Sequence, residues 1–190
     1  RNWIGKSEGA SLRFSLENSS EQIEVFTTRP DTIYGVTFMV LSPEHELVKS
    51  ITTASQKEEI ESYCQQSALK SERDRQSDVK IVTGAFTGDY AIHPFTNEKI
   101  PIWIGDYVLA SYGTGAVMAV PCGDQRDWNF ANKFGIVIKN IFKDTDISEG
   151  ANDDKAAIID NSDFLSGLTP QEAIQQSILA IEKKEIGKGK

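Results

Sequence analysis

The sequence predicts a mixed α+β fold, in which a mainly antiparallel sheet curls into a barrel-like core and helices lie at its periphery. Two observations carry this prediction. Short stretches with alternating polarity, or rich in β-branched and aromatic residues, recur over the first two thirds of the chain. Helical patterns stand between and after them, without the regular strand–helix alternation of a doubly wound nucleotide-binding fold.

The strand signals are of two kinds. Alternation of apolar and polar residues is clearest in SLRFSLE (11–17) and QIEVFTT (22–28), which bracket the polar turn NSSE and predict an antiparallel pair. A more buried strand is predicted in TIYGVTFMVL (32–41), because β-branched and aromatic residues fill it. The stretch 79–120 is again β in character, with strands expected in KIVTGAFTGDYAIHPF, KIPIWIGDYVLA and GAVMAV. A last strand is predicted in IVIKNIF (136–142).

Helix signals fill the intervening segments. Ser42-Pro43-Glu44 predicts one helix start, and 55–70 predicts a solvent-facing helix with a serine cap and an acidic first turn. A third helix is expected over 124–134, and Thr-Pro-x-Glu at Thr169 opens an amphipathic helix to about residue 181. The charged stretch 71–78 is interpreted as an exposed loop or frayed helix end, and 144–156 as a loop. The apolar stripe of the third helix is expected to be Trp128, Phe130 or Ala131, and Phe134.

Length and charge restrict the classes of protein that fit. A chain of 190 residues suits a single domain, and none of its apolar runs reaches the ~18 residues of a membrane helix. No secretory signal is recognisable, and we expect a cytoplasmic monomer. The net charge of −8, with basic residues concentrated only at 183–190, does not suit a protein that grips a long duplex. Any nucleic acid partner is expected to be a short terminal piece, or to be held by a neighbouring domain.

The cysteines and histidines favour neither a disulfide framework nor a metal centre. Cys64 and Cys122 lie too far apart for a CxxC motif, and neither His45 nor His93 has a partner at metal-ligand spacing. We therefore predict no metal site.

The first segment that could carry chemistry is TTRPDT, residues 27–32. Thr27 and Thr28 at a strand end, followed by Arg29 and Thr32, could orient a water molecule and a polar substrate. The same residues also suit a purely structural turn, in which Asp31 makes an Asx-turn. From these residues alone the structural explanation is favoured.

Two further segments follow one another directly. SYGTGAVMAVP (111–121) contains Gly-x-Gly, but its glycines lead into a strand pattern rather than a helix, so we predict a tight turn and no phosphate loop. CGDQRDW (122–128) places Asp124 and Asp127 on one face of a helix, with Arg126 beside them. Either carboxylate can cap the helix or hold a ligand, and the sequence leaves both interpretations open.

Taken together, these motifs resemble the editing domain of bacterial leucyl-tRNA synthetases. The resemblance is carried by TTRPDTIYGVTFMVLSPEHELV (27–48) and YGTGAVMAVPCGDQRDWNFANKFGI (112–136), with TGAFTGDYAIHPFTNEKIPIWIGDYVL (83–109) between them in the same order. The fold implied is the barrel-like synthetase editing fold. The HIGH and KMSKS motifs of the ATP-handling core are not recognisable, and the chain begins at Arg1 rather than Met. We therefore expect residues 1–190 to be one excised editing domain, with 1–10 and 182–190 near its junctions to the catalytic core.

The resemblance implies a hydrolase. Apolar contacts discriminate one methylene by only ~1 to 3 kcal/mol, so these synthetases use a second site that hydrolyses wrongly charged tRNA. The expected substrate is the 3′ end of tRNA-Leu carrying norvaline, isoleucine or a similar amino acid. No cofactor is expected for this reaction, whereas ATP and Mg would serve the synthetic core of the parent ligase. The catalytic core and tRNA-Leu are the implied partners.

The resemblance also implies individual roles. Asp127 is expected to bind the α-ammonium group of the substrate, with Thr27 and Thr28 at the scissile ester. Thr32 is expected to exclude leucine sterically. The remaining substrate-binding residues implied are Tyr112 and Met118 as pocket wall, Arg29 and Asp124 as a pair joining the motifs or as ligand contacts, and Arg126 beside the two carboxylates.

One position departs from the family pattern. Many members carry His directly before the first Asp of the second motif, where this chain has Gly123 after Cys122. We therefore expect hydrolysis driven by positioning of water rather than by an imidazole base, and we interpret Cys122 as a small buried residue. Two alternatives are weighed: a module that binds a tRNA 3′ end or nucleotide without chemistry, and a sugar hydrolase acting through Asp124 and Asp127. The second is disfavoured, because glycosidase carboxylates flank a bond across a cleft.

Overall fold

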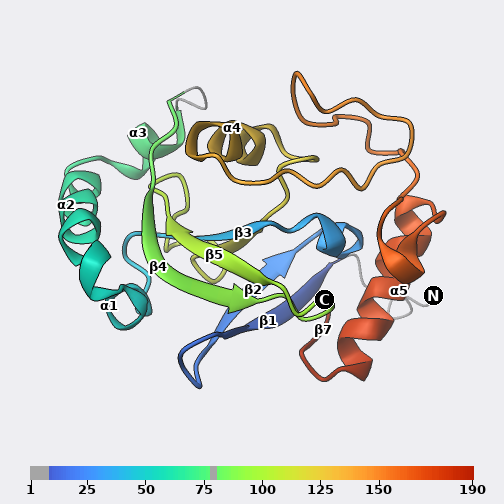
Figure 1. Cartoon of the computed structure of the whole chain (residues 1–190), viewed down its shortest axis with the longest axis horizontal. Coiled ribbons are helices and arrows are strands. Elements are labelled where there is room, and N and C mark those ends of the chain that lie inside the picture. Colours follow the sequence, from blue (N-terminus) through green and yellow to red (C-terminus); the bar gives the residue numbers. More distant parts are fainter. Residues whose placement is uncertain (1–8, 78–80) are drawn as a thin grey trace.

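The computed structural model describes residues 9–77 and 81–190. Within them, seven strands form one mixed sheet (Figure 1). Six follow the order β2-β1-β4-β5-β3-β6, and the seventh, β7, pairs with the first residues of β1. The strands are β1 (Ala10–Leu16), β2 (Gln22–Thr27), β3 (Phe38–Leu41), β4 (Ala85–Ile92), β5 (Lys99–Ile104), β6 (Ala116–Ala119) and β7 (Gly187–Gly189).

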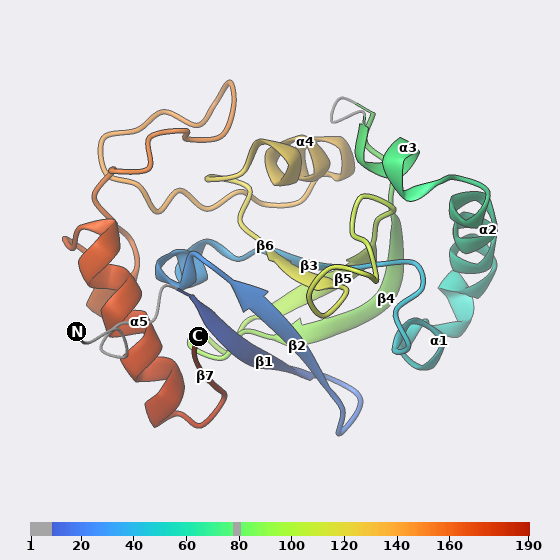
Figure 2. The same cartoon turned by 180° about the vertical axis from the view of Figure 1, so that it is seen from behind.

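The sheet nearly closes on itself. All of its strand pairs are antiparallel except β3 with β5, which run parallel in the register Met39 to Ile102. The two strands at the ends of the path, β2 and β6, also lie against each other (Figure 2). The predicted barrel-like, mainly antiparallel core with peripheral helices is thereby confirmed.

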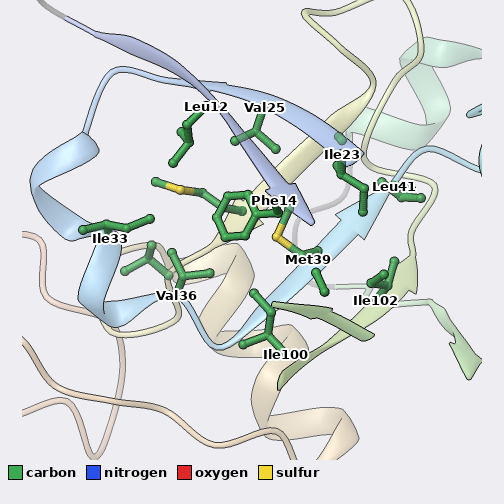
Figure 3. Close-up of a cluster of buried hydrophobic side chains, with 14 of the residues drawn as sticks. Leu12, Phe14, Ile23, Val25, Ile33, Val36, Met39, Leu41, Ile100 and Ile102 are labelled. Carbon is green, nitrogen blue, oxygen red and sulfur yellow. The ribbon is translucent and has the colours of Figure 1, made fainter. Parts of the chain in front are cut away.

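The closed sheet encloses the main hydrophobic core. Side chains from β1, β2, β3 and β5 converge inside it, and two residues before β3 complete the cluster (Figure 3). Phe14, fully buried, lies among them. The alternation that predicted β1 and β2 is explained by this burial, because every second residue of each strand faces the enclosed core. The labelled members are Leu12, Phe14, Ile23, Val25, Ile33, Val36, Met39, Leu41, Ile100 and Ile102.

A second apolar cluster lies on the outer face of the sheet and anchors α4 (Gln125–Phe134). All four residues of β3 are buried, because alternate side chains face the barrel and α4. The rings of Phe38 on β3 and Phe130 on α4 stack with their centroids 5.2 Å apart. Phe130 and Ala131 of the predicted helix stripe are fully buried, whereas Trp128 and Phe134 are partly buried.

The other helices surround the barrel. The helices α1 (Val48–Ile51), α2 (Lys57–Ala68) and α3 (Glu72–Ser77) lie on one side of it, and α5 (Pro170–Lys183) lies on the opposite side (Figure 1). The predicted start of α5 is confirmed in detail: Thr169 and Glu172 form a reciprocal capping box. Short 3-10 helices occur at η2 (Pro30–Gly35), η3 (Ala54–Gln56) and η4 (Asp163–Leu165). No helix within 9–77 and 81–190 has the length and apolar character to cross a membrane.

Some helix predictions need correction. The first helix begins at Val48, later than the predicted Ser42-Pro43-Glu44, and α2 has no side-chain cap from Ser55. The stretch 71–78 was predicted as an exposed loop or frayed helix end, but Glu72–Ser77 is helical. Its Arg75 side chain donates to the backbone carbonyls of residues 106 and 108 and pairs with Glu44. These contacts with residues about thirty positions away stabilise the helix, and patterns of neighbouring residues cannot predict them.

Two strand predictions are partly wrong. The N-terminal half of 32–41 belongs to η2, because the proline at its first position and the turn bonds that follow favour a 3-10 helix. The segment 136–142 forms no strand; one isolated bridge joins Phe142 to Ile159. Its Ile141 is fully buried nevertheless, so its apolar residues reflect core packing.

The two ends of the described chain lie side by side. Gly9 and Lys190 exchange backbone hydrogen bonds of 3.2 and 2.8 Å beside the β1–β7 pair.

Candidate active site

The segment 27–32 leaves β2, enters η2 and is tied to itself by hydrogen bonds. Thr27 Oγ1 accepts from the backbone N–H of Arg29 at 2.9 Å, and Thr32 Oγ1 donates to the backbone carbonyl of Arg29 at 2.8 Å. Thr32 is buried, whereas Thr28 is exposed. Because the Thr27 and Thr32 hydroxyls already have partners, Thr28 offers the more available hydroxyl of this segment to an incoming group.

The expected pairing of Arg29 with Asp124 is wrong. Arg29 instead forms a two-pronged ion pair with Asp31, with Nη2–Oδ2 at 2.8 Å and Nε–Oδ1 at 3.0 Å. Asp31 is fully buried, and an unpaired carboxylate there would be costly, so the neighbouring guanidinium is its natural partner. The pair stabilises the turn within one motif rather than joining the two motifs.

In the segment 122–128, the two aspartates have different roles: one caps α4 and the other is a buried carboxylate. Asp124 caps α4: its Oδ1 accepts from the backbone N–H of Asp127 at 3.0 Å. Asp127 lies in the first turn with its side chain turned inward, and its Oδ2 accepts from the backbone N–H of Val120 at 3.0 Å. Only 8% of Asp127 is exposed, so one acidic residue is structural and the other is a buried carboxylate.

Val120 connects the two motifs. Its backbone N–H binds Asp127, and its side chain packs on Gly35 at the end of η2. A methyl group added at Gly35 would lie 3.0 Å from Val120 Cγ1 and 3.2 Å from Ile141 Cδ1, so the backbone of η2 approaches this closely only because residue 35 is glycine. Next to this contact, the backbone N–H of Thr37 donates to the carbonyl of Ala119 at 3.2 Å. The structure therefore brings the two predicted motifs together.

The electrostatic environment of Asp127 is unusual for a carboxylate. Burial raises its pKa to about 8, and the charge of Asp124 acts in the same direction. The hydrogen bonds from Val120 N–H and Tyr107 and the charge of Arg126 oppose the rise without cancelling it. A cation placed beside Asp127 would stabilise its ionised form, so the group is suited to receive one.

Tyr107 is a site residue that the sequence analysis missed. Its hydroxyl lies 3.4 Å from Asp127 Oδ1, on the carboxylate oxygen that Val120 does not bind. Burial and the nearby carboxylates raise its pKa well above the usual value, so the phenol remains a neutral donor. The Arg126 guanidinium lies over the Tyr107 ring, 5.2 Å from its centroid. Twenty residues separate Tyr107 from Asp127, and no local motif signals this contact.

The two residues predicted to form the pocket wall, Met118 and Tyr112, differ in exposure. Met118 is buried in β6, opposite Met39 of β3, whereas Tyr112 is 73% exposed in the turn before β6. The predicted tight glycine turn is confirmed, since Gly113 and Gly115 have φ angles of 56° and 72°. That Tyr112 and Met118 line a substrate pocket stays a prediction, as does ligand binding by Arg126.

Cys122 is fully buried, and burial raises the pKa of its thiol to about 11. The interpretation as a small buried residue is confirmed, because a thiol with so high a pKa is a poor nucleophile near neutral pH. Over residues 9–77 and 81–190, no group of three His, Cys, Asp or Glu side chains is placed to hold a metal ion.

Comparisons with known proteins place this geometry in context. The family described as "Leucyl-tRNA synthetase, editing domain" matches residues 1–182. Leucine–tRNA ligases of Christiangramia forsetii and Flavobacterium johnsoniae are 61% and 59% identical to the chain, and in each case the match covers 100% of the chain and 20% of the ligase. The chain thus spans about a fifth of the length of these curated relatives.

A solved structure shares the fold. It is the crystal structure of a ternary complex of Agrobacterium radiobacter LeuRS with tRNA and LeuAMS, with a TM-score of 0.73 and 32% sequence identity. The match covers 100% of the present chain and 20% of the LeuRS chain.

The buried Asp127 predicts a characteristic pH dependence of stability. Its folded-state pKa of about 8 lies above the ordinary aspartate pKa of 3.8, so its stabilising contribution is complete below about pH 4. This contribution is lost as the pH rises towards 8. Asp127→Asn cannot ionise, so its free energy of unfolding should lose less over this range, with a difference of at most about 1.4 kcal/mol per pH unit. Urea unfolding of both proteins from pH 5 to pH 8 measures it; a wild-type slope no steeper than that of the variant would contradict the assignment.

Tyr107→Phe should raise the pKa of Asp127 further, because the variant loses a donor to the ionised carboxylate but keeps the ring packed on Phe130. Carboxyl-carbon NMR titration measures the shift directly. Tyr90→Phe, on the outer face of β4, is the matched control and should leave the Asp127 titration unchanged. An unchanged titration in Tyr107→Phe would show that the 3.4 Å contact between the Tyr107 hydroxyl and Asp127 Oδ1 does not stabilise the ionised carboxylate.

Proposed function

Because the chain belongs to the leucyl-tRNA synthetase editing domain family, we propose that it hydrolyses the ester that joins a wrong amino acid to the terminal adenosine of tRNA-Leu. The observation that carries this proposal is Asp127. It is a buried carboxylate with a raised pKa at the start of α4. Val120, whose N–H binds it, packs on Gly35 at the end of η2, the 3-10 helix that follows Thr27 and Thr28. An aminoacyl ester presents an α-ammonium group, which is the kind of cation that such a carboxylate receives.

The proposed chemistry uses water as the nucleophile. With its ammonium group on Asp127, the ester carbonyl would lie toward Thr27 and Thr28, whose hydroxyl and backbone groups orient a water molecule. Attack at the carbonyl carbon breaks the bond to the ribose oxygen, which takes up a proton and leaves as the tRNA hydroxyl. The products are the free amino acid and uncharged tRNA. The reaction needs no cofactor of its own.

The structure supports a role for positioning rather than for an imidazole base at position 123. A Cβ atom at Gly123 would lie 3.1 Å from the ring of Phe142, so a larger side chain at this position requires that ring to shift.

We assign the exclusion of leucine to Thr32. Its hydroxyl is fixed by the 2.8 Å hydrogen bond to the Arg29 carbonyl, and this bond fixes the rotamer and hence the position of its methyl group. A methyl group held in one place can obstruct one side chain and admit another, which is discrimination by steric conflict. Such a block protects correctly charged leucyl-tRNA.

The rest of the parent ligase would supply what this chain lacks. With a net charge of −8, the chain itself offers little attraction to a polyanion, so tRNA affinity should come chiefly from outside it. Ligation of leucine with ATP and Mg is assigned to the synthetic core of the parent. The proposed direct partners of this chain are the charged 3′ end of tRNA-Leu and that core.

Asp127→Asn should lower the rate of deacylation of norvalyl-tRNA-Leu by about 10- to 100-fold, because a charge-assisted hydrogen bond is lost. Asp124→Asn is the matched control, since asparagine also caps helices. It removes a charge that raises the pKa of Asp127, so its rate should stay close to that of the wild type above pH 8, where Asp127 is ionised in both proteins. The wild-type rate should rise with pH up to about 8 as Asp127 ionises. Binding of the charged tRNA end without hydrolysis in the wild type would favour a non-catalytic binding module instead.

Thr32→Ala should begin to hydrolyse correctly charged leucyl-tRNA-Leu, with a gain of about 10- to 100-fold over the wild type, since one or two methyl-sized contacts are worth ~1 to 3 kcal/mol. Thr32→Val carries a methyl group at both branch positions, so the blocking methyl is kept without the hydroxyl, and the variant should continue to spare leucyl-tRNA. Release of radiolabelled leucine and norvaline measures both activities. The steric assignment is wrong if Thr32→Ala spares leucyl-tRNA while it still hydrolyses norvalyl-tRNA.

A further inference from the structure

A buried histidine outside the proposed site contacts the segment that carries Thr32. His93 follows β4 directly, and only 1% of it is exposed. Its Nε2 lies 2.7 Å from the backbone carbonyl oxygen of Ile33 in η2, sixty residues away in the chain. The histidine therefore joins the β4–β5 connection to η2.

The hydrogen bonds of the ring identify its tautomer. Nδ1 is approached by the backbone N–H groups of Phe95 at 3.1 Å and Thr96 at 3.3 Å, so it must accept. The proton of the neutral ring then lies on Nε2, from which it is donated to the Ile33 carbonyl. Both ring nitrogens are satisfied in one orientation, and rotation of the ring would break these contacts.

The surroundings keep this ring uncharged. Burial lowers the pKa of His93, and the positive charge of Lys139 acts in the same direction, while the Ile33 carbonyl and Glu98 oppose it. Lys139 and Glu98 themselves form an ion pair at 2.5 Å. A proton added at Nδ1 would face two N–H donors, so the neutral form is the one that fits.

The carbonyl that His93 binds holds a particular position in η2. Ile33 directly follows Thr32, and its carbonyl also accepts from the Val36 N–H at 3.2 Å, which closes the 3-10 helix. The His93 ring packs beside the Tyr34 ring, with centroids 6.1 Å apart, and edge-on to Phe14 of the barrel core at 6.3 Å. The imidazole thus packs between η2 and the barrel, and its hydrogen bond is one of the contacts, together with Val120 on Gly35, that hold η2 in place.

We propose that His93 is a positioning residue for editing specificity, which holds η2 against the barrel and thereby sets the position of the Thr32 methyl group. The inference rests on the proposed function, because it assigns to His93 the placement of the group that excludes leucine. It requires no contact between His93 and the substrate. A steric block is sensitive to small displacements, so loss of the anchor should relax discrimination before it affects the reaction itself.

Two isosteric substitutions separate the two ends of the imidazole. In His93→Asn the amide oxygen can replace Nδ1 as acceptor for residues 95 and 96, but the bond to Ile33 is lost. In His93→Gln the amide nitrogen can replace Nε2 as donor to the Ile33 carbonyl. If both variants are folded, as thermal unfolding of the 190-residue chain would show, they differ in the presence of the anchor.

Hydrogen exchange, followed by mass spectrometry in peptides that cover residues 29–37, measures the anchor without any activity. Exchange in this segment should be about 2- to 12-fold faster in His93→Asn than in the wild type, as expected for one lost hydrogen bond, and close to wild type in His93→Gln. Unchanged exchange in His93→Asn, or equal acceleration in both variants, would overturn the proposal.

Deacylation of leucyl- and norvalyl-tRNA-Leu then tests the effect on specificity. The ratio of kcat/KM for leucyl- over norvalyl-tRNA should rise about 2- to 12-fold in His93→Asn and remain at the wild-type value in His93→Gln. A parallel fall of both rates at a constant ratio would indicate a merely structural role and refute the assignment. If the wild-type chain hydrolyses neither ester even at saturating charged tRNA, the proposed function fails, and with it the specificity role, whereas the exchange comparison still decides whether His93 holds η2.

Discussion

The hydrogen bond from the Val120 backbone to the Asp127 carboxylate is the contact on which the arrangement of the site depends. It requires β6 to end beside the first turn of α4, and it requires α4 to lie flat on the outer face of β3, where Phe38 and Phe130 stack. Because the side chain of Val120 also packs on Gly35, the same residue contacts η2. An isolated buried carboxylate would be costly, and this hydrogen bond offsets part of that cost in the absence of substrate. Because the hydrogen bond offsets only part of the cost, a cation beside Asp127 would further stabilise its ionised form.

The two apolar clusters give this site rigid support on both sides. β3 is buried on both faces, so neither η2, which precedes it, nor α4, which covers it, can shift without disturbing a packed interior. The near closure of the sheet brings β2 to β6, and Gly35 of η2, which follows β2, packs on Val120, which follows β6. Residues from opposite ends of the strand order meet because the sheet curls. The barrel is in this sense a prerequisite of the site as well as of the stability of the fold.

The sequence predicted those features whose cause is local. Alternating polarity identified β1 and β2, and the Thr-Pro-x-Glu pattern identified the start of α5, because each depends on residues close in the chain. Prediction failed where the partner is distant: Arg75 holds α3 through backbone groups about thirty residues away, and Tyr107 reaches Asp127 across the β5–α4 interface. For Arg29 a distant partner was predicted and the real one is local. Its guanidinium pairs with the nearby Asp31, while the predicted partner Asp124 caps α4. The motifs therefore identified segments that meet in the fold, but their residues alone did not give the contacts between them.

The hydrogen bonds between Gly9 and Lys190 have a mechanical consequence. A longer polypeptide that contains this domain enters and leaves it through two neighbouring backbone segments, next to the β1–β7 pair. Two strands that run antiparallel and side by side form a narrow ribbon, which bends and twists more readily than a broad interface. The described ends of the domain therefore lie together at one edge of the barrel, rather than on opposite sides of it. For the deacylation proposed above, attachment at a single edge would leave the orientation of the domain adjustable without loosening the barrel.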